Sequence, residues 1–489
     1  MSPEDHNPED DAPARTWWGM HSRELSSGMV SLVLHATVLL ALALLVFPRE
    51  RVHPRFDLIQ TEVVNNPVPV TTENLKVQAP TLTEGDLNNL AALQFETTVV
   101  SEQPSLTEVD VSPEQLAAQI EAEAFLGREH TEGEFAGRTE QARAMFANAF
   151  GGNASTEAAV NSGLKWLAEH QQPDGSWHFD HRCERCDETC NSPGGLNNAT
   201  VAATSLAMLA YLGAGNTHKS GKYQPQMERA LRYMLQKHAA AEIPGDLREN
   251  PSENSSFYTQ GLATIALCET YGMTGDRTIL KPAQQSVNFI IDSQHAEAGG
   301  WRYRLGQEGD TSVVGWQVMA LTSAGMSRIA IPTKPKTLAM RFLDSVQSEN
   351  GALYGYTVPE KKASTTAIGL LCRQYLGWNM NRPGMDAGCR FLSAQGPSHD
   401  DMYYNYYATQ VLHHKGGPMW IKWNDVMRAQ LLSTQTREGH AAGSWPPRDR
   451  HGAGPGGRHY MTCLCVLTLE VYYRHLPLYQ RKSTTGKEF

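Results

Sequence analysis

A pattern of helix, turn and returning tryptophan opens the main part of the chain. From Asn161 to Trp177 the sequence reads NSGLKWLAEHQQPDGSW, in which apolar side chains at helical spacing lead into a Gln pair and a Pro-Asp-Gly segment. The apolar positions predict a helix that ends near Gln171, and the Pro-Asp-Gly segment predicts a turn. Less complete copies follow down the chain, so the pattern predicts a repeat protein.

Six two-helix units follow Gly152. Their first helices carry Lys, Arg and Glu, recur at roughly fifty residues and are centred on Trp166, Tyr233, Phe289, Phe342, Phe391 and Leu431. Five units close with a Gln, at Gln171, Gln294, Gln347, Gln395 and Gln435, and three return through Gly to Trp177, Trp301 and Trp445. The second helices are apolar and rich in small residues, at 200–213, 257–271, 312–324, 365–375, 403–413 and 460–473. Polar first helices suit an outer layer and apolar second helices an inner layer, which predicts a double ring.

The Gln-x(3-5)-Gly-x-Trp units resemble the QW repeats of squalene-hopene cyclases and the related repeats of protein prenyltransferase β-subunits. The resemblance covers about residues 155–478 and is most specific in the first and last units. It implies an all-α fold, an α/α6 toroid of six helical hairpins and twelve helices in two concentric layers. We expect the Gln and Trp side chains to join neighbouring hairpins, with each indole N–H donating to a carbonyl. An open solenoid of the tetratricopeptide type is the alternative, but its repeats are shorter and lack this turn.

The N-terminal part has a different composition. An apolar run from Met29 to Phe47 is long enough, at about 1.5 Å per residue, to cross most of a hydrocarbon core of roughly 30 Å. We therefore predict a transmembrane helix, because a cleaved signal peptide would need a small-x-small site that this segment lacks. The expected organisation is a polar tail at 1–27, the transmembrane helix at 28–48, an extended linker at 49–110, lead-in helices at 111–152, the toroid at 153–478 and a polar tail at 479–489.

Two arguments on orientation conflict. Arginines are more frequent after the predicted span than before it, which opposes export of the C-terminal part. A short tail, one span and a large domain are nevertheless typical of an exported protein. We expect a single-pass membrane protein with an N-terminal anchor and an extracytoplasmic toroid. The formal net charge of -10 and the lack of a dense Lys/Arg stripe predict no nucleic-acid partner.

The catalytic motifs of the resembled families are incomplete here. The Asp-x-Asp-Asp motif of squalene-hopene cyclases is absent, and Asp400-Asp401 is the one adjacent acidic pair in a plausible place, at the head of the fifth inner helix. A helix N-terminus stabilises an ionised carboxylate and makes it a poorer acid, and helix capping is the alternative role. The prenyltransferase zinc triad is broken, because Met402 and Met461 stand where Cys and His are expected and thioethers bind zinc poorly.

Two classes of function stay open, and whether the chain is an enzyme is undecided. In the first, Asp400, Asp401 and His459 are candidate acid, base or ligand groups acting on an isoprenoid-like or other apolar molecule. In the second, the toroid is a non-catalytic binding or scaffolding module. Either way, aromatic and amide side chains at the inner-helix heads suit an apolar small molecule, although they could simply fill the centre. The candidates for this ligand cavity are Asn198, Tyr258, Gln260, Trp316, Gln317, Tyr403, Tyr407 and Tyr460.

A separate cluster lies in the loop of the first unit. His181, Cys183, Cys186 and Cys190 total four zinc-type ligands, and the Cys-x2-Cys spacing fits one half of a zinc site. Four ligands within ten residues strain the geometry, since structural zinc sites usually draw on two separated segments. In an exported domain a local disulfide is the favoured alternative. Zinc is therefore considered but not favoured, and the cofactor is left unassigned.

Overall fold

The computed structural model describes residues 134–187, 190–449 and 451–475. Twelve helices of this part form two layers. The inner helices are α5 (Thr200–Gly213), α7 (Ser256–Thr274), α9 (Thr311–Met326), α11 (Ala363–Tyr375), α13 (Met402–Lys415) and α15 (Ala453–Leu469). The outer helices are α4 (Ala154–Glu169), α6 (Gln224–Ala240), α8 (Arg277–Asp292), α10 (Thr333–Val346), α12 (Pro383–Gln395) and α14 (Gly417–Thr434).

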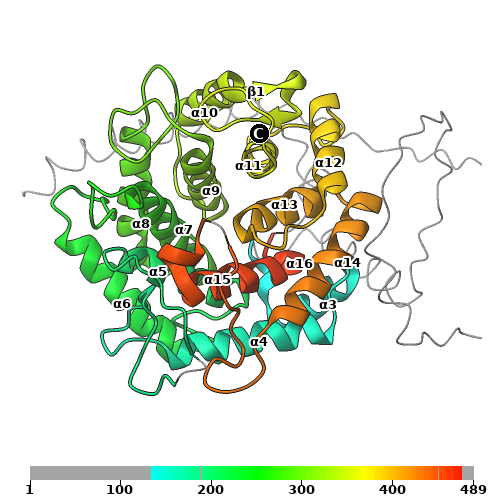
Figure 1. Cartoon of the computed structure of the whole chain (residues 1–489). Helices are drawn as coiled ribbons and strands as arrows, with labels where there is room; N and C mark the ends of the chain where they lie inside the picture. Colours follow the sequence, from blue (N-terminus) through cyan, green and yellow to red (C-terminus); the bar gives the residue numbers. More distant parts are fainter. Residues whose placement is uncertain (1–133, 188–189, 450, 476–489) are drawn as a thin grey trace, which may run out of the picture. The chain divides into compact units, whose positions relative to one another are not determined.

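The inner helices form a closed ring. Each packs against the next in chain order from α5 to α15, and α15 packs back against α5 (Figure 1). In the outer layer α12 contacts α14, and α14 contacts α4, so the last repeat also meets the first there. An open superhelix would leave its two ends apart. The predicted α/α6 toroid is therefore the observed fold.

Burial follows the polarity of the two layers. Every residue of α5 from Val201 to Gly213 is buried, as expected for a helix with neighbours on all sides. The outer helix α8 instead buries a stripe that includes Ile279, Ala283 and Ile290, while its other face meets solvent. The small residues of the inner helices allow this close approach. Gly315 in α9, for example, has no room for a Cβ, which would lie 2.5 Å from Ile368 in α11.

Three of the five repeat glutamines join neighbouring hairpins as predicted. Gln171 Nε2 donates to the carbonyl of Gly175, in its own turn, and to that of Gln226, in the first turn of α6, each at 2.9 Å. Gln294 and Gln435 make the same two kinds of hydrogen bond, one to their own turn and one to the next outer helix. We call this pair of bonds the clasp.

The returning tryptophans hold their own hairpins, so the prediction that they join neighbouring hairpins is wrong, although each indole N–H does donate to a carbonyl. Trp177 Nε1 donates to the carbonyl of Leu167, near the end of α4, at 2.7 Å. Trp301 donates to Ile290 in α8 and Trp445 to a carbonyl in α14 in the same way. Each indole is buried, so the bond satisfies its N–H where water cannot reach. The Gln thus spans two hairpins, whereas the Trp fastens one.

The fourth unit departs from the helical prediction. Strand β1 (Gln347–Ser348) pairs antiparallel with β2 (Leu353–Tyr354) through the register Gln347 to Tyr354. The 3-10 helix η3 (Glu349–Gly351) joins the two strands. This short hairpin takes the place of the Gly-Trp return, and the sequence pattern did not predict it. The ring around it is unchanged.

One end of the ring is closed by segments that flank the repeats. These are η2 (Ala136–Arg138), α3 (Glu140–Phe150) and α16 (Val471–Arg474). Arg138 and Arg474 both reach Glu269, near the carboxyl end of α7, at 2.7 Å and 3.3 Å. All three side chains are almost fully buried. The opposite end, at the amino ends of the inner helices, carries the candidate site.

The prediction of a membrane anchor requires correction. Among the residues that the structure describes, no helix is both long and apolar enough to cross a membrane, and the predicted span at 28–48 lies outside them. A single-pass, membrane-located protein with an extracytoplasmic toroid is therefore not supported. The predicted segments 1–27, 49–110 and 479–489 also lie outside the described residues, and the domain boundaries stay predictions.

Candidate functional site

Aromatic and hydroxyl side chains from three inner helices meet at the amino ends of α7, α9 and α13. The Tyr258 hydroxyl donates to Ser312 Oγ at 2.8 Å, and Ser312 Oγ lies 2.9 Å from the Tyr403 hydroxyl. Trp316 Nε1 donates to the same Tyr403 oxygen at 2.9 Å. Tyr258, Ser312 and Tyr403 are half-buried, so this array lies at the mouth of the ring. Three of the predicted cavity residues are thus brought together.

Packed aromatic rings support the array from below. Trp316 is stacked on Tyr406 with ring centroids 5.8 Å apart, and it meets Tyr407 edge-on at the same separation. Tyr407 is fully buried, and burial raises its pKa well above the usual value. Tyr407 therefore belongs to the packed centre, while Tyr403, whose ring lies 5.1 Å from it, is half-buried above it.

The predicted cavity residue Gln260 has a structural contact instead. Its Nε2 donates to the carbonyl of Gly245 at 2.9 Å and to that of Ser286, in α8, at 3.3 Å. Its Oε1 accepts from the N–H of Leu247 at 2.7 Å. The second unit has no closing Gln, so an inner-helix Gln makes the clasp there. Nothing in the local sequence marks this exchange.

The other cavity candidates are dispersed. Gln317 is buried and donates to the carbonyl of Phe257 at 2.7 Å, which ties α9 to α7. Asn198 is exposed in the loop before α5, and Tyr460 is half-buried on α15. Tyr258 is linked to Tyr403 through Ser312, and Trp316 bonds directly to Tyr403.

Asp310, which the sequence analysis did not select, lies at the head of α9. Its Oδ1 accepts from the N–H of Val313 at 2.9 Å, and the side chain is fully buried. Burial raises the pKa of Asp310 to about 6, against the hydrogen bond from Val313 and the nearby Arg302. The Asp310 charge in turn raises the pKa of Tyr258 and Tyr403, in addition to the larger effect of burial. An Asp directly before an apolar helix that starts with Thr-Ser was the available signal, and it is indistinguishable from an ordinary helix cap.

Arg302, Tyr303 and Tyr356 complete this side of the site. Arg302 Nε lies 3.7 Å from Asp310 Oδ2, and its guanidinium lies over both tyrosine rings, 5.5 Å and 5.8 Å from their centroids. The two tyrosine hydroxyls are hydrogen-bonded to each other. Tyr303 also contacts Tyr258, with 6.4 Å between ring centroids. A carboxyl group, a guanidinium and several phenols therefore border one another.

The predicted acid and base groups are not brought together. Asp401 Oδ1 accepts from the N–H of Tyr404 at 2.8 Å and caps α13, and burial raises its pKa. Asp400 Oδ1 accepts from Ser398 Oγ at 3.0 Å. His459 donates from Nε2 to the carbonyl of Ala203, on α5, at 2.8 Å, and burial lowers its pKa to about 3. His459 is thus engaged with α5 rather than with either carboxylate.

The place where the prenyltransferase resemblance implies zinc is a small cavity of about 30 Å³, lined by Asp400, Met402, Asp449, Met461 and Cys465 among others. The space is close to that of one water molecule. Asp449 is buried, and its Oδ2 accepts from the N–H of Met402 at 2.9 Å, so it already serves as a cap. With two thioethers in the donor set, this cavity does not fit zinc.

A second cluster gathers His and Cys side chains from three segments. His170 follows α4, Cys186 and Cys190 lie in the loop before α5, and His440 lies in the turn after α14. One ligand atom from each of the four lies within 4.8 Å of all the others. His170 Nε2 lies 3.2 Å from Cys190 Sγ and 3.4 Å from Cys186 Sγ.

The sequence identified half of this cluster. Of the predicted ligands, Cys186 and Cys190 belong to it. Cys183 Sγ lies 3.5 Å from Cys186 Sγ at its edge, and His181 Nε2 lies 3.2 Å from the carbonyl of Cys190. The other two members were missed. His170 precedes the cysteines within the first unit, at the end of α4, and His440 belongs to the last unit, which only the closed ring brings next to the first.

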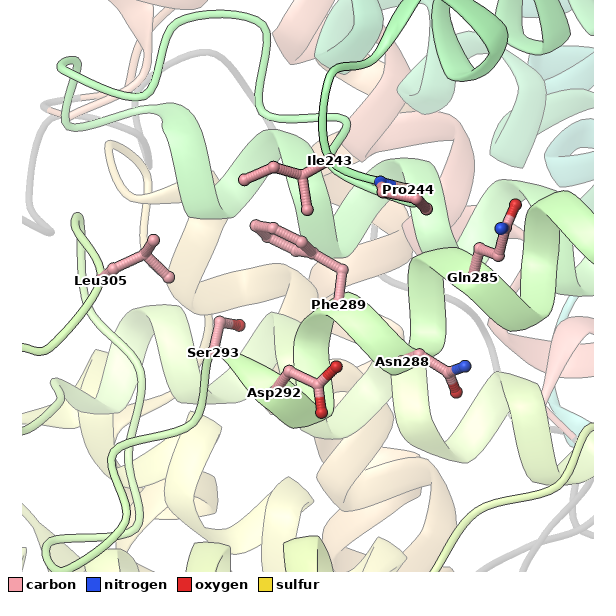
Figure 2. A pocket seen from close by; sticks show the side chains of 8 residues that line it. All are labelled: Ile243, Pro244, Gln285, Asn288, Phe289, Asp292, Ser293 and Leu305. Carbon is pink, nitrogen blue, oxygen red and sulfur yellow. The ribbon is translucent and has the colours of Figure 1, made fainter.

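A larger cavity of about 420 Å³ lies on the outer wall. It is lined by Ile243, Pro244, Gln285, Asn288, Phe289, Asp292, Ser293 and Leu305. Figure 2 shows Ile243 and Leu305 on loops around Phe289 of α8. Ile243 and Leu305 are each about half exposed, at 50% and 51%. This groove shares no lining residue with the predicted central cavity.

The comparisons with known proteins find similar solved structures only, at low sequence identity. No protein-family model matches the chain, and no curated protein matches it. Solved structures similar to it include the GH76A α-1,6-mannanase of Salegentibacter sp. HEL1_6, in an inactive variant with bound mannotetrose. The sequence identity is 11% and the TM-score is 0.46, and the match covers 66% of this chain and 99% of the mannanase chain. They also include the cellobiose 2-epimerase of Spirochaeta thermophila, with 10% identity and a TM-score of 0.49 over 65% and 96%.

The type II terpene cyclase MstE of Scytonema is similar at the same level. It shares 12% identity with a TM-score of 0.45 over 65% of this chain and 98% of that one. The TM-scores of these three structures lie below 0.5 and their identities at 10–12%, so they give no assignment of activity to this chain. The ring of contacts places this chain in the wider class of α/α toroid proteins, and its activity must be argued from its own residues.

Proposed function

We propose that the toroid binds an apolar, isoprenoid-like small molecule at the mouth of the ring. The observation that supports this is the hydrogen-bonded array of Tyr258, Ser312, Trp316 and Tyr403. The array holds two half-buried phenol rings in place at the amino ends of three inner helices. Aromatic faces cover hydrocarbon, and the phenol and serine oxygens can bind a polar end group.

The polar end of the ligand would lie toward Asp310 and Arg302. Arg302 can pair with a negatively charged or strongly polar head group, and a guanidinium does so through several donors. Asp310 has a pKa near 6, which suits a group that accepts or donates a proton near neutral pH. If the bound molecule is transformed, Asp310 is our candidate for the proton transfer. The second candidate function is that the same site binds the molecule without transforming it.

Binding is tested on the purified full chain with C15 and C20 polyprenyl alcohols and their diphosphates, by calorimetry. We expect saturable binding of at least one of these compounds. Tyr403→Ala should weaken it about tenfold or more, because it removes both the ring and the oxygen shared by Ser312 and Trp316. Tyr403→Phe should retain most of the affinity for the alcohols, since the ring remains.

Tyr271→Phe is the matched control, because Tyr271 lies on the same helix as Tyr258 but near its other end. It should bind as the wild type does. Uptake of no polyprenyl compound by a folded wild-type chain would favour the non-catalytic platform. Equal affinity in wild type and Tyr403→Ala would place the ligand elsewhere, with the outer groove as the next region to test.

A further inference from the structure

We propose that His170, Cys186, Cys190 and His440 bind one zinc ion that ties the first repeat of the ring to the last. Two thiolates and two imidazoles form a common structural zinc set, which is tetrahedral and closed. His170, Cys186 and Cys190 belong to the first unit, and only the closed ring brings His440 of the last unit to them. The site is independent of the small-molecule site proposed above.

The distances agree with one shared ion. Zinc bonds of about 2.0–2.3 Å place tetrahedral donors about 3.3–3.8 Å apart. His170 Nε2 lies 3.2 Å from Cys190 Sγ and 3.4 Å from Cys186 Sγ, and the whole set lies within 4.8 Å. The rings of His170 and His440 are 4.8 Å apart between centroids. Small shifts of these side chains would therefore complete the coordination.

The tautomer of His170 is already the one that a zinc ligand needs. Its Nδ1 lies 2.7 Å from the carbonyl of Trp166, and a carbonyl can only accept, so Nδ1 carries the proton. The lone pair of the neutral ring is then on Nε2, which faces both sulfurs. Metal-bound histidines usually donate their other ring N–H to such a carbonyl or carboxylate.

His440 has no competing contact at one ring nitrogen. Its Nδ1 is buried and has no hydrogen-bond partner among the described residues. An unsatisfied buried imidazole nitrogen is unfavourable unless something fills the position. A metal ion at the centre of the four side chains would give the His440 ring a partner in addition to the contacts that His170 already makes with both sulfurs.

The surroundings fit a structural site at the seam of the ring. Arg458, in α15, is buried and donates to the main-chain and side-chain oxygens of Asn191, the residue after Cys190, each at 2.9 Å. The same loop continues into main-chain hydrogen bonds to the start of α15, from Gly195 to Gly454 and from Leu196 to a neighbouring carbonyl. Arg458 also supplies positive charge near the thiolates.

A disulfide between Cys183 and Cys186 is the competing arrangement. Their sulfurs are 3.5 Å apart, which a local movement would close to about 2.05 Å. That bond would remove Cys186 as a ligand and leave His170 and His440 facing one remaining thiol. It does not account for the approach of two histidines from the first and last units, whereas zinc does.

The test is zinc content of the full chain, purified under reducing conditions, by elemental analysis. We expect one zinc per chain. Cys190→Ser and His440→Ala should lose most of it, whereas Cys183→Ser and His181→Ala, the matched controls from the same loop, should keep it. Loss of zinc in Cys183→Ser with full retention in His440→Ala would overturn the assignment of the fourth ligand.

Cobalt substitution decides the case if a variant does not fold. The wild-type chain loaded with Co²⁺ should show tetrahedral visible bands and thiolate charge-transfer absorption, and Cys186→Ser should lose about half of the latter. A chain that takes up neither metal, and whose Cys183–Cys186 peptide carries a disulfide by mass spectrometry without reductant, would overturn the proposal.

Discussion

The side-chain amide of Gln435 donates a hydrogen bond of 2.9 Å to the main-chain carbonyl of Ala159, so the last outer helix is joined to the first. The same amide donates to the carbonyl of Gly443 in its own turn, also at 2.9 Å. Gln171 makes the equivalent bond to Gln226 between units that the chain itself connects. At the seam no such connection exists. Closure of the ring therefore depends on packing and on contacts of this kind.

We predict that Gln435→Ala lowers the free energy of unfolding by about 1–3 kcal/mol, because two carbonyls lose a donor. Urea denaturation of the full chain, followed by circular dichroism, measures the change. Gln395→Ala is the control, since Gln395 has the same position in its repeat but is exposed. It should change stability by no more than about 0.5 kcal/mol. Equal effects of the two substitutions would show that the clasp does not stabilise the ring.

Gly443, in the turn that follows α14, is also predicted to be important for the stability of the chain. Gly443 has φ +94°, and a Cβ there would lie 2.2 Å from the carbonyl oxygen of Ser162 in α4. Gly275 also has a positive φ, +61°, but a Cβ at Gly275 meets nothing within 4 Å. Left-handed backbone costs about 1–2 kcal/mol for Ala, and a clash with backbone adds about 1–3 kcal/mol.

Gly443→Ala should therefore destabilise the chain by about 1–3 kcal/mol more than Gly275→Ala. Thermal and urea unfolding of the two variants side by side give the comparison. If Gly275→Ala costs as much, the conformation of the turn, rather than the close approach of the first and last units, explains the glycine.

The helical part of the fold could be predicted because each helix shows a local periodicity of apolar residues. The predicted helix at 200–213 coincides with α5, and the next four inner helices differ from their predictions by a few residues at their ends. The last prediction, 460–473, is less accurate, because it covers the end of α15 and all but one residue of α16. The Gln positions predicted the clasp in three units. It failed in the second unit, where no closing Gln exists and Gln260 of the inner helix makes the bonds instead. The β1–β2 hairpin was missed because strands of two residues are too short to show an alternating pattern.

The candidate sites were less predictable, because contacts between residues of distant repeats have no local signal in the sequence. Cys186 and Cys190 were visible as a spaced pair, but His170 and His440 belong to opposite ends of the repeat array. Asp310 looked like a helix cap, and its raised pKa comes from burial that only the packed ring produces. The resemblance to cyclases and prenyltransferases led to Asp400, Asp401 and His459, but His459 is hydrogen-bonded to α5 and Asp401 caps α13.

We predict that Glu269→Gln destabilises the chain by about 3–5 kcal/mol, because it removes the ion-pair partner of buried Arg138 and the nearer of the two carboxylates beside buried Arg474, the other being Glu470 at 3.8 Å. Burial alone would raise the pKa of Glu269, but the two arginines hold it below its usual value, so the carboxylate is ionised in the folded state. Glu228→Gln is the control, since the Glu228 pair with Arg232 is solvent-exposed. It should cost less than about 1 kcal/mol. A cost of that size for Glu269→Gln would mean that the arginines find other partners.

Asp310 predicts a distinct pH dependence. Its pKa is raised from 3.8 to about 6, so between these values the folded chain holds a proton that the unfolded chain has released. Stability contributed by Asp310 is then present below pH 4 and lost as pH rises to 6, by about 3 kcal/mol. Asp310→Asn keeps the cap but cannot titrate. Urea unfolding of both chains from pH 4 to pH 7 should show the wild type losing stability relative to the variant over this range. Parallel curves would show that Asp310 is ionised in the folded protein at pH 4, and would remove it as the candidate for proton transfer.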